Sequence, residues 1–193
     1  NALKQLFSDL IYEDMGSILD IYERNPYQEI SKTIKNVIES IKKEKDNIGD
    51  EIDHPIGRLY QRLSDTLLKS VQSGNLELIR TLVENGVNIN DAFEPSRQTP
   101  LHVAVDHGHL ELVGYLLTKG SRVDMRDSRG CTPLNLAVKT GNAEIVSLLL
   151  DECTNNIEDA MNSKDEYGMA PLDSAVRKRN LGMVRLLLAK GGK

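Results

Sequence analysis

Few residues of this chain are placed to do chemistry. Three of its four histidines lie close together, at His102, His107 and His109, and histidine is a common zinc ligand. A zinc site is not expected there, because no Cys or carboxylate is placed to complete a tetrahedral set. His107 and His109 are also two residues apart, a spacing that does not put side chains on one helical face. We therefore predict no metal site from these histidines.

Two other groups carry reactive side chains. Residues 50–54, Asp-Glu-Ile-Asp-His, could hold a divalent ion, but a charge cluster in a polar linker is usually only solvated. Cys131 is close to Arg129, which could activate a thiol, yet no histidine or other base is in register with it. We interpret Cys131 as an inert surface thiol. With no nucleophile–base pair, glycine-rich phosphate loop or zincin motif, the sequence predicts a protein that is not an enzyme and needs no cofactor.

Composition narrows the choice of partner. The 193 residues include 24 basic and 29 acidic side chains, for a net charge of −5, so electrostatic binding to nucleic acid has no obvious source. No apolar run approaches the roughly 18 residues of a membrane span. Two cysteines do not make a disulfide framework, which favours reduced thiols and a cytoplasmic protein, with a nuclear location as the alternative.

A short motif recurs along the second half of the chain. Thr99-Pro100-Leu101-His102 is followed 33 residues later by Thr132-Pro133-Leu134-Asn135, and 38 residues after that by Ala170-Pro171-Leu172-Asp173. A degenerate copy begins at Asp65-Thr66-Leu67-Leu68. Each motif predicts the start of a short helix, because Thr is a good N-cap and Pro is favoured at the first helical position.

A second helix follows each motif. After the first complete copy, Gly108 suits the positive φ that ends a helix. The next residues then form one apolar helical face, made of Leu110, Leu112, Val113, Leu116 and Leu117. Motif and leucine-rich helix recur together, so the chain contains an internal repeat of helix pairs.

These motifs resemble the ankyrin repeat, a turn and two antiparallel helices with a Thr-Pro-Leu-His signature. The resemblance covers about four units in residues 58–193. It implies an all-α ankyrin-repeat solenoid that binds other proteins. It also implies a structural role for His102, as a hydrogen-bond partner of turn backbone.

The N-terminal part of the chain precedes the repeats. Hydrophobic periodicity predicts helices over residues 3–24 and 27–45, which form a hairpin, and a polar linker over residues 46–57. A further helix begins near Ile56 or Arg58 and runs into the first repeat. We thus expect two parts, residues 1–57 and 58–193. The hairpin either caps the repeats or binds a partner, and oligomerisation through residues 3–45 is one form of the second alternative.

The repeats depart from the family pattern in three places. The loop over residues 91–98 lacks the usual Gly and is one residue longer than its successor. Five extra residues fall within residues 151–161, as an exposed loop or a longer helix. The last repeat is polar at residues 177–180 and at Arg185, so it is either an end cap or is followed by more of the parent protein.

The resemblance implies that loop tips contact the partner. In the family, the two residues before the loop Gly and the one after it face partners, and here these are Ser128, Arg129, Cys131, Glu166, Tyr167 and Met169. Phe93 is an aromatic residue in a polar loop. It is either an interface anchor or part of the loop's own core.

The family's second contact strip lies on the concave helix surface. Its residues here are Gln72, Ser73, Asp106, His107, Lys139, Thr140, Arg177 and Lys178. The strip becomes basic toward the C-terminal end, which fits an acidic partner segment, although a solvated face is the alternative. Among these we expect Asp106, His107, Lys139 and Arg177 to bind a partner.

Two functions fit these observations. The first is a non-catalytic module that binds a partner protein or peptide through repeat loops and the concave helix face. The second is a regulatory or targeting segment of a larger enzyme, channel or trafficking protein, with the hairpin as junction. An enzyme in its own right is disfavoured because no catalytic constellation is present in the sequence.

Overall fold

The computed structural model describes residue 39 and residues 55–153 and 156–191. The expected helices over residues 3–24 and 27–45, and most of the linker, lie outside the described residues. The chain divides into two compact units, which are described separately: residues up to 67 together with 77–87, and residues 68–76 with those from 88 onward.

The described part of the first unit contains most of α4 (Pro55–Gln72) and α5 (Leu76–Glu84). Helix α4 confirms the expected helix that runs into the first repeat. It begins at Pro55, one residue before the earlier of the two expected starts, because Pro is tolerated in the first turn of a helix. The apolar interior of this unit is formed by buried side chains of both helices, namely Leu63 and Leu67 of α4 and Leu78, Ile79 and Leu82 of α5.

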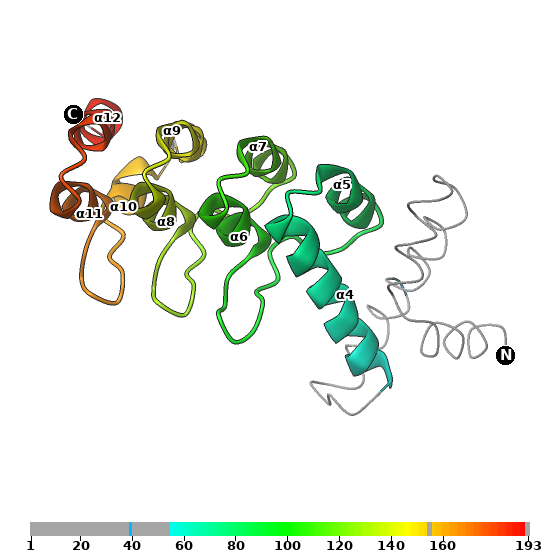
Figure 1. Cartoon of the computed structure of the whole chain (residues 1–193). Coiled ribbons are helices and arrows are strands. Elements are labelled where there is room, and N and C mark those ends of the chain that lie inside the picture. Colours follow the sequence, from blue (N-terminus) through cyan, green and yellow to red (C-terminus); the bar gives the residue numbers. More distant parts are fainter. Residues whose placement is uncertain (1–38, 40–54, 154–155, 192–193) are drawn as a thin grey trace, which may run out of the picture. The chain divides into compact units, whose positions relative to one another are not determined.

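The second unit is built from three helix pairs. These are α6 (Pro100–Asp106) with α7 (Leu110–Thr118), α8 (Pro133–Thr140) with α9 (Ala143–Glu152), and α11 (Pro171–Arg177) with α12 (Leu181–Gly191). The first helices contact one another in the order α6, α8, α11, and the second helices in the order α7, α9, α12. Figure 1 shows these two rows, with the loops that precede the first helices extending to one side. The expected stack of helix pairs is confirmed.

Capping explains where the first helices begin. Thr99 and Thr132 are extended residues, and their side-chain oxygens accept the backbone N–H of the third helical residue. Pro100 and Pro133 follow at the first helical position, where a missing N–H costs nothing. Gly108, just beyond α6, has a φ of +73°, as expected from its place in the sequence.

The core of the second unit is thin and aliphatic. Each first helix buries small and branched side chains between its neighbours, and each second helix adds leucine and valine. Figure 1 shows this unit as two layers of short helices, so no large aromatic side chain is needed to fill its interior.

The extra residues of the third pair are partly helical. Helix α9 is one residue longer than α7, and a short helix, α10 (Ile157–Met161), follows it and contacts α12. The insertion therefore adds a helical turn to the unit and not only an exposed loop. In the part of the chain that the structure describes, no helix is both long and apolar enough for a membrane crossing.

We predict that Ala170→Thr stabilises the protein. Ala170 has the same extended backbone as Thr99 and Thr132, but its side chain cannot accept the helix N–H that their hydroxyls bind. Adding the missing cap is expected to raise the free energy of unfolding by about 1 kcal/mol. Urea denaturation measures it. Ala170→Val, which has the shape without the hydroxyl, is the matched control and should not reproduce the gain.

Candidate protein-binding surface

Each of the two complete loops is built around one buried aspartate. The Asp127 carboxylate accepts the backbone N–H of Arg129 at 2.9 Å and of Cys131 at 2.8 Å, and its own N–H donates to the Cys131 carbonyl at 2.9 Å. These bonds close the loop at its base. The side chains between them are left to point outward from a fixed backbone.

The next loop repeats this arrangement. The Asp165 carboxylate accepts the N–H of Tyr167 at 2.9 Å and of Met169 at 3.0 Å, and its N–H donates to the Met169 carbonyl at 3.1 Å. The Asp-x-x-Gly spacing at residues 127–130 and 165–168 is the sequence signal for both loops. Sequence reasoning missed these aspartates, because it considered only the positions that face outward.

The loops are also bonded to one another. Glu166 N–H donates to the Arg129 carbonyl at 2.9 Å, and Ser128 N–H donates to the Ser96 carbonyl at 2.8 Å. The Arg126 guanidinium bridges the same two complete loops, donating to the carbonyls of Gly130 at 2.7 Å and Lys164 at 2.6 Å. Three successive loops therefore form one connected, hydrogen-bonded edge.

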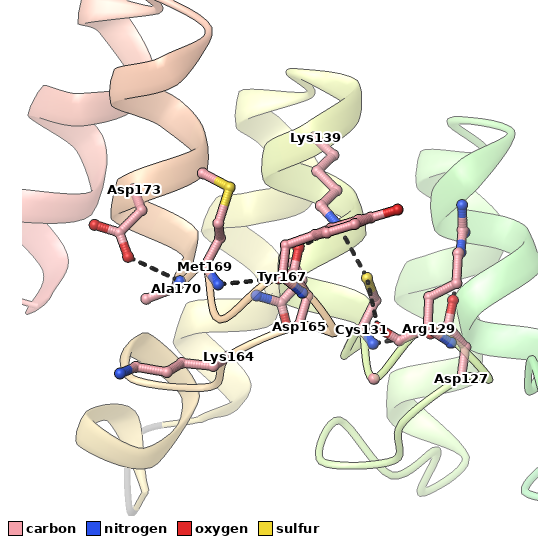
Figure 2. Close-up of polar contacts among 12 residues, drawn as sticks. Asp127, Arg129, Cys131, Lys139, Lys164, Asp165, Tyr167, Met169, Ala170 and Asp173 are labelled. Atoms are coloured by element: carbon pink, nitrogen blue, oxygen red, sulfur yellow. Dashed lines mark hydrogen bonds and ion pairs between the residues drawn. The ribbon is translucent and has the colours of Figure 1, made fainter.

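Four of the expected contact residues are exposed on this edge. Ser128 and Arg129 lie on one loop and Glu166 and Tyr167 on the next. Tyr167 is 73% exposed, and Figure 2 shows its ring extending over the loop edge between Lys139 and Arg129. An exposed aromatic ring beside an arginine is typical of an interface anchor. We name Ser128, Arg129, Glu166 and Tyr167 the loop-tip patch.

Cys131 is not a surface residue. Its side chain is fully buried, and its backbone carbonyl is bonded to Asp127 and to His102. The residue after the loop Gly thus turns into the protein, so the expectation that Cys131 is a surface thiol that faces a partner is wrong. Met169, at the same position of the next loop, is half-buried, and its N–H is committed to Asp165.

Phe93 belongs to the core of its own loop, and its expected role as an exposed anchor is wrong. Its N–H donates to the Gln98 carbonyl at 2.8 Å, the same bond that Asp127 and Asp165 make in their loops. Phe93 therefore stands at their buried position. Arg97, with a φ of +54°, takes the left-handed position that Gly130 has in the next loop. Because this loop lacks the Gly and has one extra residue, the alignment of Phe93 with Asp127 and Asp165 could not be seen in the sequence.

Lys139 is engaged inside the protein. Its ammonium lies 2.7 Å from a carboxylate oxygen of Asp165 and donates to the Cys131 sulfur at 3.1 Å (Figure 2). Burial opposes the charge of Asp165, but Lys139 and the amides of Met169 and Tyr167 outweigh it and hold the pKa of Asp165 below its usual value. Burial likewise opposes the charge of Lys139, but the bonds to Asp165 and Cys131 raise its pKa. Lys139 thus joins the two loops.

The remaining strip residues are exposed. Asp106, His107, Thr140, Arg177 and Lys178 all present their side chains to solvent, as do Gln72 and Ser73. His107 and His109 end one helix and begin the next, so they share no helical face, but the turn at Gly108 brings their rings into a stack with centroids 5.9 Å apart. Across the described ranges, no three His, Cys, Asp or Glu side chains gather as metal ligands would.

His102 has the structural role that the sequence implied. Its Nδ1 accepts the Thr99 N–H at 3.2 Å and lies 2.8 Å from the Thr99 hydroxyl, so its Nε2 carries the proton and donates to the Cys131 carbonyl at 3.1 Å. Asn135 repeats this with its amide, accepting from Thr132 and donating to the Ser163 carbonyl at 3.0 Å. Burial lowers the pKa of His102 and keeps the ring neutral.

The second unit thus has the architecture of a stacked helical-repeat protein with a rigid loop edge. The comparison with known families agrees: the chain matches the family described as "Ankyrin repeats (3 copies)" over residues 36–127 and 115–193, and it belongs to that family. Ankyrin repeats are a protein-interaction module and are generally non-catalytic.

Relatives share about a third of the chain. It is 36% identical over 66 residues to the human 2-5A-dependent ribonuclease, and 36% identical over 66 residues to the BRCA1-associated RING domain protein 1 of Caenorhabditis elegans. Each match covers 34% of this chain and 9% of the relative. The mouse ankyrin repeat domain-containing protein 17 is 35% identical over 67 residues, which are 34% of this chain and 3% of that protein. The chain therefore matches only a small segment of each relative.

We predict that Asp165→Asn destabilises the protein by roughly 1.5–3 kcal/mol, because a buried carboxylate with charge-assisted bonds is lost. The pKa of Asp165 is lowered in the folded state, so its stabilisation is present above the unfolded value of about 3.9 and is lost as pH falls through the folded value. Urea denaturation should show the full difference from the parent at pH 7, and the difference should shrink as the pH is lowered toward 3.

The matched control is Asp124→Asn. Asp124 is paired with Arg122 at 2.7 Å, but both side chains are more than half exposed. Exposed ion pairs contribute little, so no measurable loss is expected. Equal losses for the two variants would contradict the structural role of Asp165.

We predict that His102→Asn removes a pH dependence without removing the cap, because Asn135 makes the equivalent bonds. The lowered pKa of His102 means that the unfolded chain takes up its proton first, so stability is present above about pH 6.5 and falls below it. Between pH 7.5 and 5.5 the parent should lose up to about 1.4 kcal/mol per pH unit more than the variant. Denaturation curves at both pH values test this, and parallel losses would contradict it.

Proposed function

We propose that this chain is a non-catalytic module that binds a partner protein or peptide through its loop-tip patch and the adjoining exposed helix strip. The observation that carries the proposal is the bond from Glu166 N–H to the Arg129 carbonyl. It joins two loops whose outward side chains include an arginine, a glutamate and a largely exposed tyrosine. A partner that contacts both loops meets a surface that needs no ordering on binding, which limits the entropy cost.

The strip residues extend this surface. Asp106, His107 and Arg177 are exposed and lie at equivalent ends of the first helices, so they are available to a ligand that lies across several repeats. Lys139 is removed from the contact set, because its charge is balanced within the protein. The basic end, with Arg177 and Lys178, supports an acidic partner segment near α11.

Other classes of function have less support. A net charge of −5 gives no overall electrostatic attraction to nucleic acid, and the loops and helix ends account for the glycines without a phosphate site. We therefore propose a protein ligand and no catalytic role, in the cytoplasm or the nucleus. Oligomerisation through residues 3–45 remains a proposal about residues outside the described part.

A second candidate is a regulatory or targeting segment of a larger protein. The relatives favour it, since the matched segment is 9% or less of the ribonuclease, of the RING domain protein and of ankyrin repeat domain-containing protein 17. In that case the loop-tip patch would hold a second region of the same polypeptide or its substrate. The two candidates share one surface and differ in what occupies it.

We predict that the variant Arg129→Ala/Glu166→Ala/Tyr167→Ala loses ligand binding and keeps its fold. Peptides selected from a displayed random library against the full chain serve as probes, and fluorescence titration measures their affinity. Removing a tyrosine and an arginine from one patch should weaken binding at least about tenfold. The thermal midpoint should move by less than about 2 °C, because these side chains are exposed.

The control replaces exposed residues of the second helices, as Glu111→Ala/Glu144→Ala/Arg185→Ala. It should bind the peptides like the parent. Unchanged binding in the loop-tip variant, or the same loss in the control, would place the binding surface elsewhere.

A further inference from the structure

In the last helix pair, the first helix, α11, exposes a valine whose equivalents in α6 and α8 are buried. Val105, Val138 and Val176 each stand five residues after the proline that begins their helix. Val105 is 0% exposed and Val138 is 1% exposed, but Val176 is 58% exposed. The residue type and its place in the helix are the same, so something outside the helix causes the difference.

Helix α12, the second helix of the same pair, shows the same change in exposure. Leu117 and Leu150 are 8% and 1% exposed, whereas the equivalent Leu188 is 54% exposed. Leu181, at the start of α12, is 71% exposed, against 36% for the equivalent Leu110 in α7. Two further positions that are fully buried in the earlier pairs are only half-buried in the last one, namely Leu172 and Val184.

The covering element explains the pattern. Helix α8 lies against α6 and covers it, and α11 does the same for α8, while α9 and α12 follow in the second row. Within the described residues, no helix pair follows α11 and α12. Val176, Leu181 and Leu188 therefore form an open continuation of the interface that joins the earlier pairs. We name these three residues the stacking face.

A terminal cap does not have such a face. End repeats of solenoids have polar residues at the stacking positions. Apolar surface that stays exposed to water forgoes a stabilisation of roughly 25 cal/mol per Å². Arg177 and Arg185 do make the surroundings polar, but the stacking face itself keeps valine and leucine. The stacking face therefore has the composition of an interface between repeats and not that of an end cap.

We propose that the stacking face is covered by a further ankyrin-type helix pair, placed on α11 and α12 as α8 and α9 are placed on α6 and α7. Arg179, which stands at the turn where the earlier pairs have Gly108 and Gly141, does not prevent a further pair from stacking. A Cβ built on Gly108 or Gly141 would lie 3.9 or 3.7 Å from the side-chain amide of the following pair's Asn142 or Asn180, an ordinary contact. At the equivalent turn, the Cβ of Arg179 would make a similar contact with a next pair.

Extending the full chain tests the proposal. Lys190-Gly191 align with Lys119-Gly120, so a copy of residues 123–153 appended after Lys193 supplies the chain's own turn and helix pair in register. The extension is expected to raise the thermal midpoint by about 5 °C or more. Amide hydrogen exchange in α11 and α12 should slow by about tenfold or more.

Val176→Glu/Leu188→Glu is the decisive variant. Its unextended form should keep its midpoint within about 2 °C, since both side chains are more than half exposed, and its extended form should show no gain. Tyr167→Glu, at a more exposed residue on the loop edge, should leave the gain intact. A missing gain with the parent sequence, or a gain that survives Val176→Glu/Leu188→Glu, would overturn the proposal. So would a dimer of the unextended chain that this variant dissociates, seen by sedimentation velocity, because a second copy would then occupy the face.

Discussion

The arrangement depends on one type of buried hydrogen bond, from the fourth residue of the two threonine motifs to the loop of the next repeat. His102 reaches the Cys131 carbonyl and Asn135 reaches the Ser163 carbonyl, while the other end of each side chain binds its own threonine. One buried polar group thus fixes both where a helix starts and how the next repeat is placed. A shifted register would leave it unpaired at a cost of about 1–3 kcal/mol, so the stack has one favoured alignment.

This alignment determines which side chains a partner can reach. With the loop bases held by Asp127 and Asp165, the residues at the base turn inward, and only the two residues before each loop Gly remain at the tip. Lys139 pairs with Asp165 because a carboxylate removed from solvent is stable only with a partner of opposite charge. The rigidity that makes the loop edge suitable for binding therefore removes Cys131, Lys139 and Phe93 from it.

The sequence predicted what acts locally. Threonine caps, the proline at the first helical position and the periodic leucines depend on neighbours within one repeat, so the helix pairs could be predicted from the recurring motif. The role of His102, which bonds to the next repeat, followed only from the resemblance to the ankyrin signature. Burial of Phe93 depends on Arg97 taking a left-handed conformation, which no local rule indicates. The pairing of Lys139 with Asp165 joins different repeats and becomes visible only when they are stacked. The short helix α10 lacked a periodic signal because it has only five residues, too few for a hydrophobic pattern to repeat.

The last helix pair combines the weakest local signals with half of the loop-tip patch. Ala170 stands where the earlier motifs have a capping threonine, and Asp173 stands where they have the buried His102 and Asn135. The Asp173 carboxylate is exposed and accepts the Ala170 N–H. In a stack, the stability of a helix pair is the sum of its intrinsic stability and the contributions of its interfaces with neighbouring pairs. Within the described residues, α11 and α12 have such an interface on one side only. Glu166 and Tyr167 stand on the loop that leads into this pair, whereas Arg129 stands on the loop before α8. A ligand that binds all three spans the interface between the two repeats, so its binding free energy adds to the folding of the last pair.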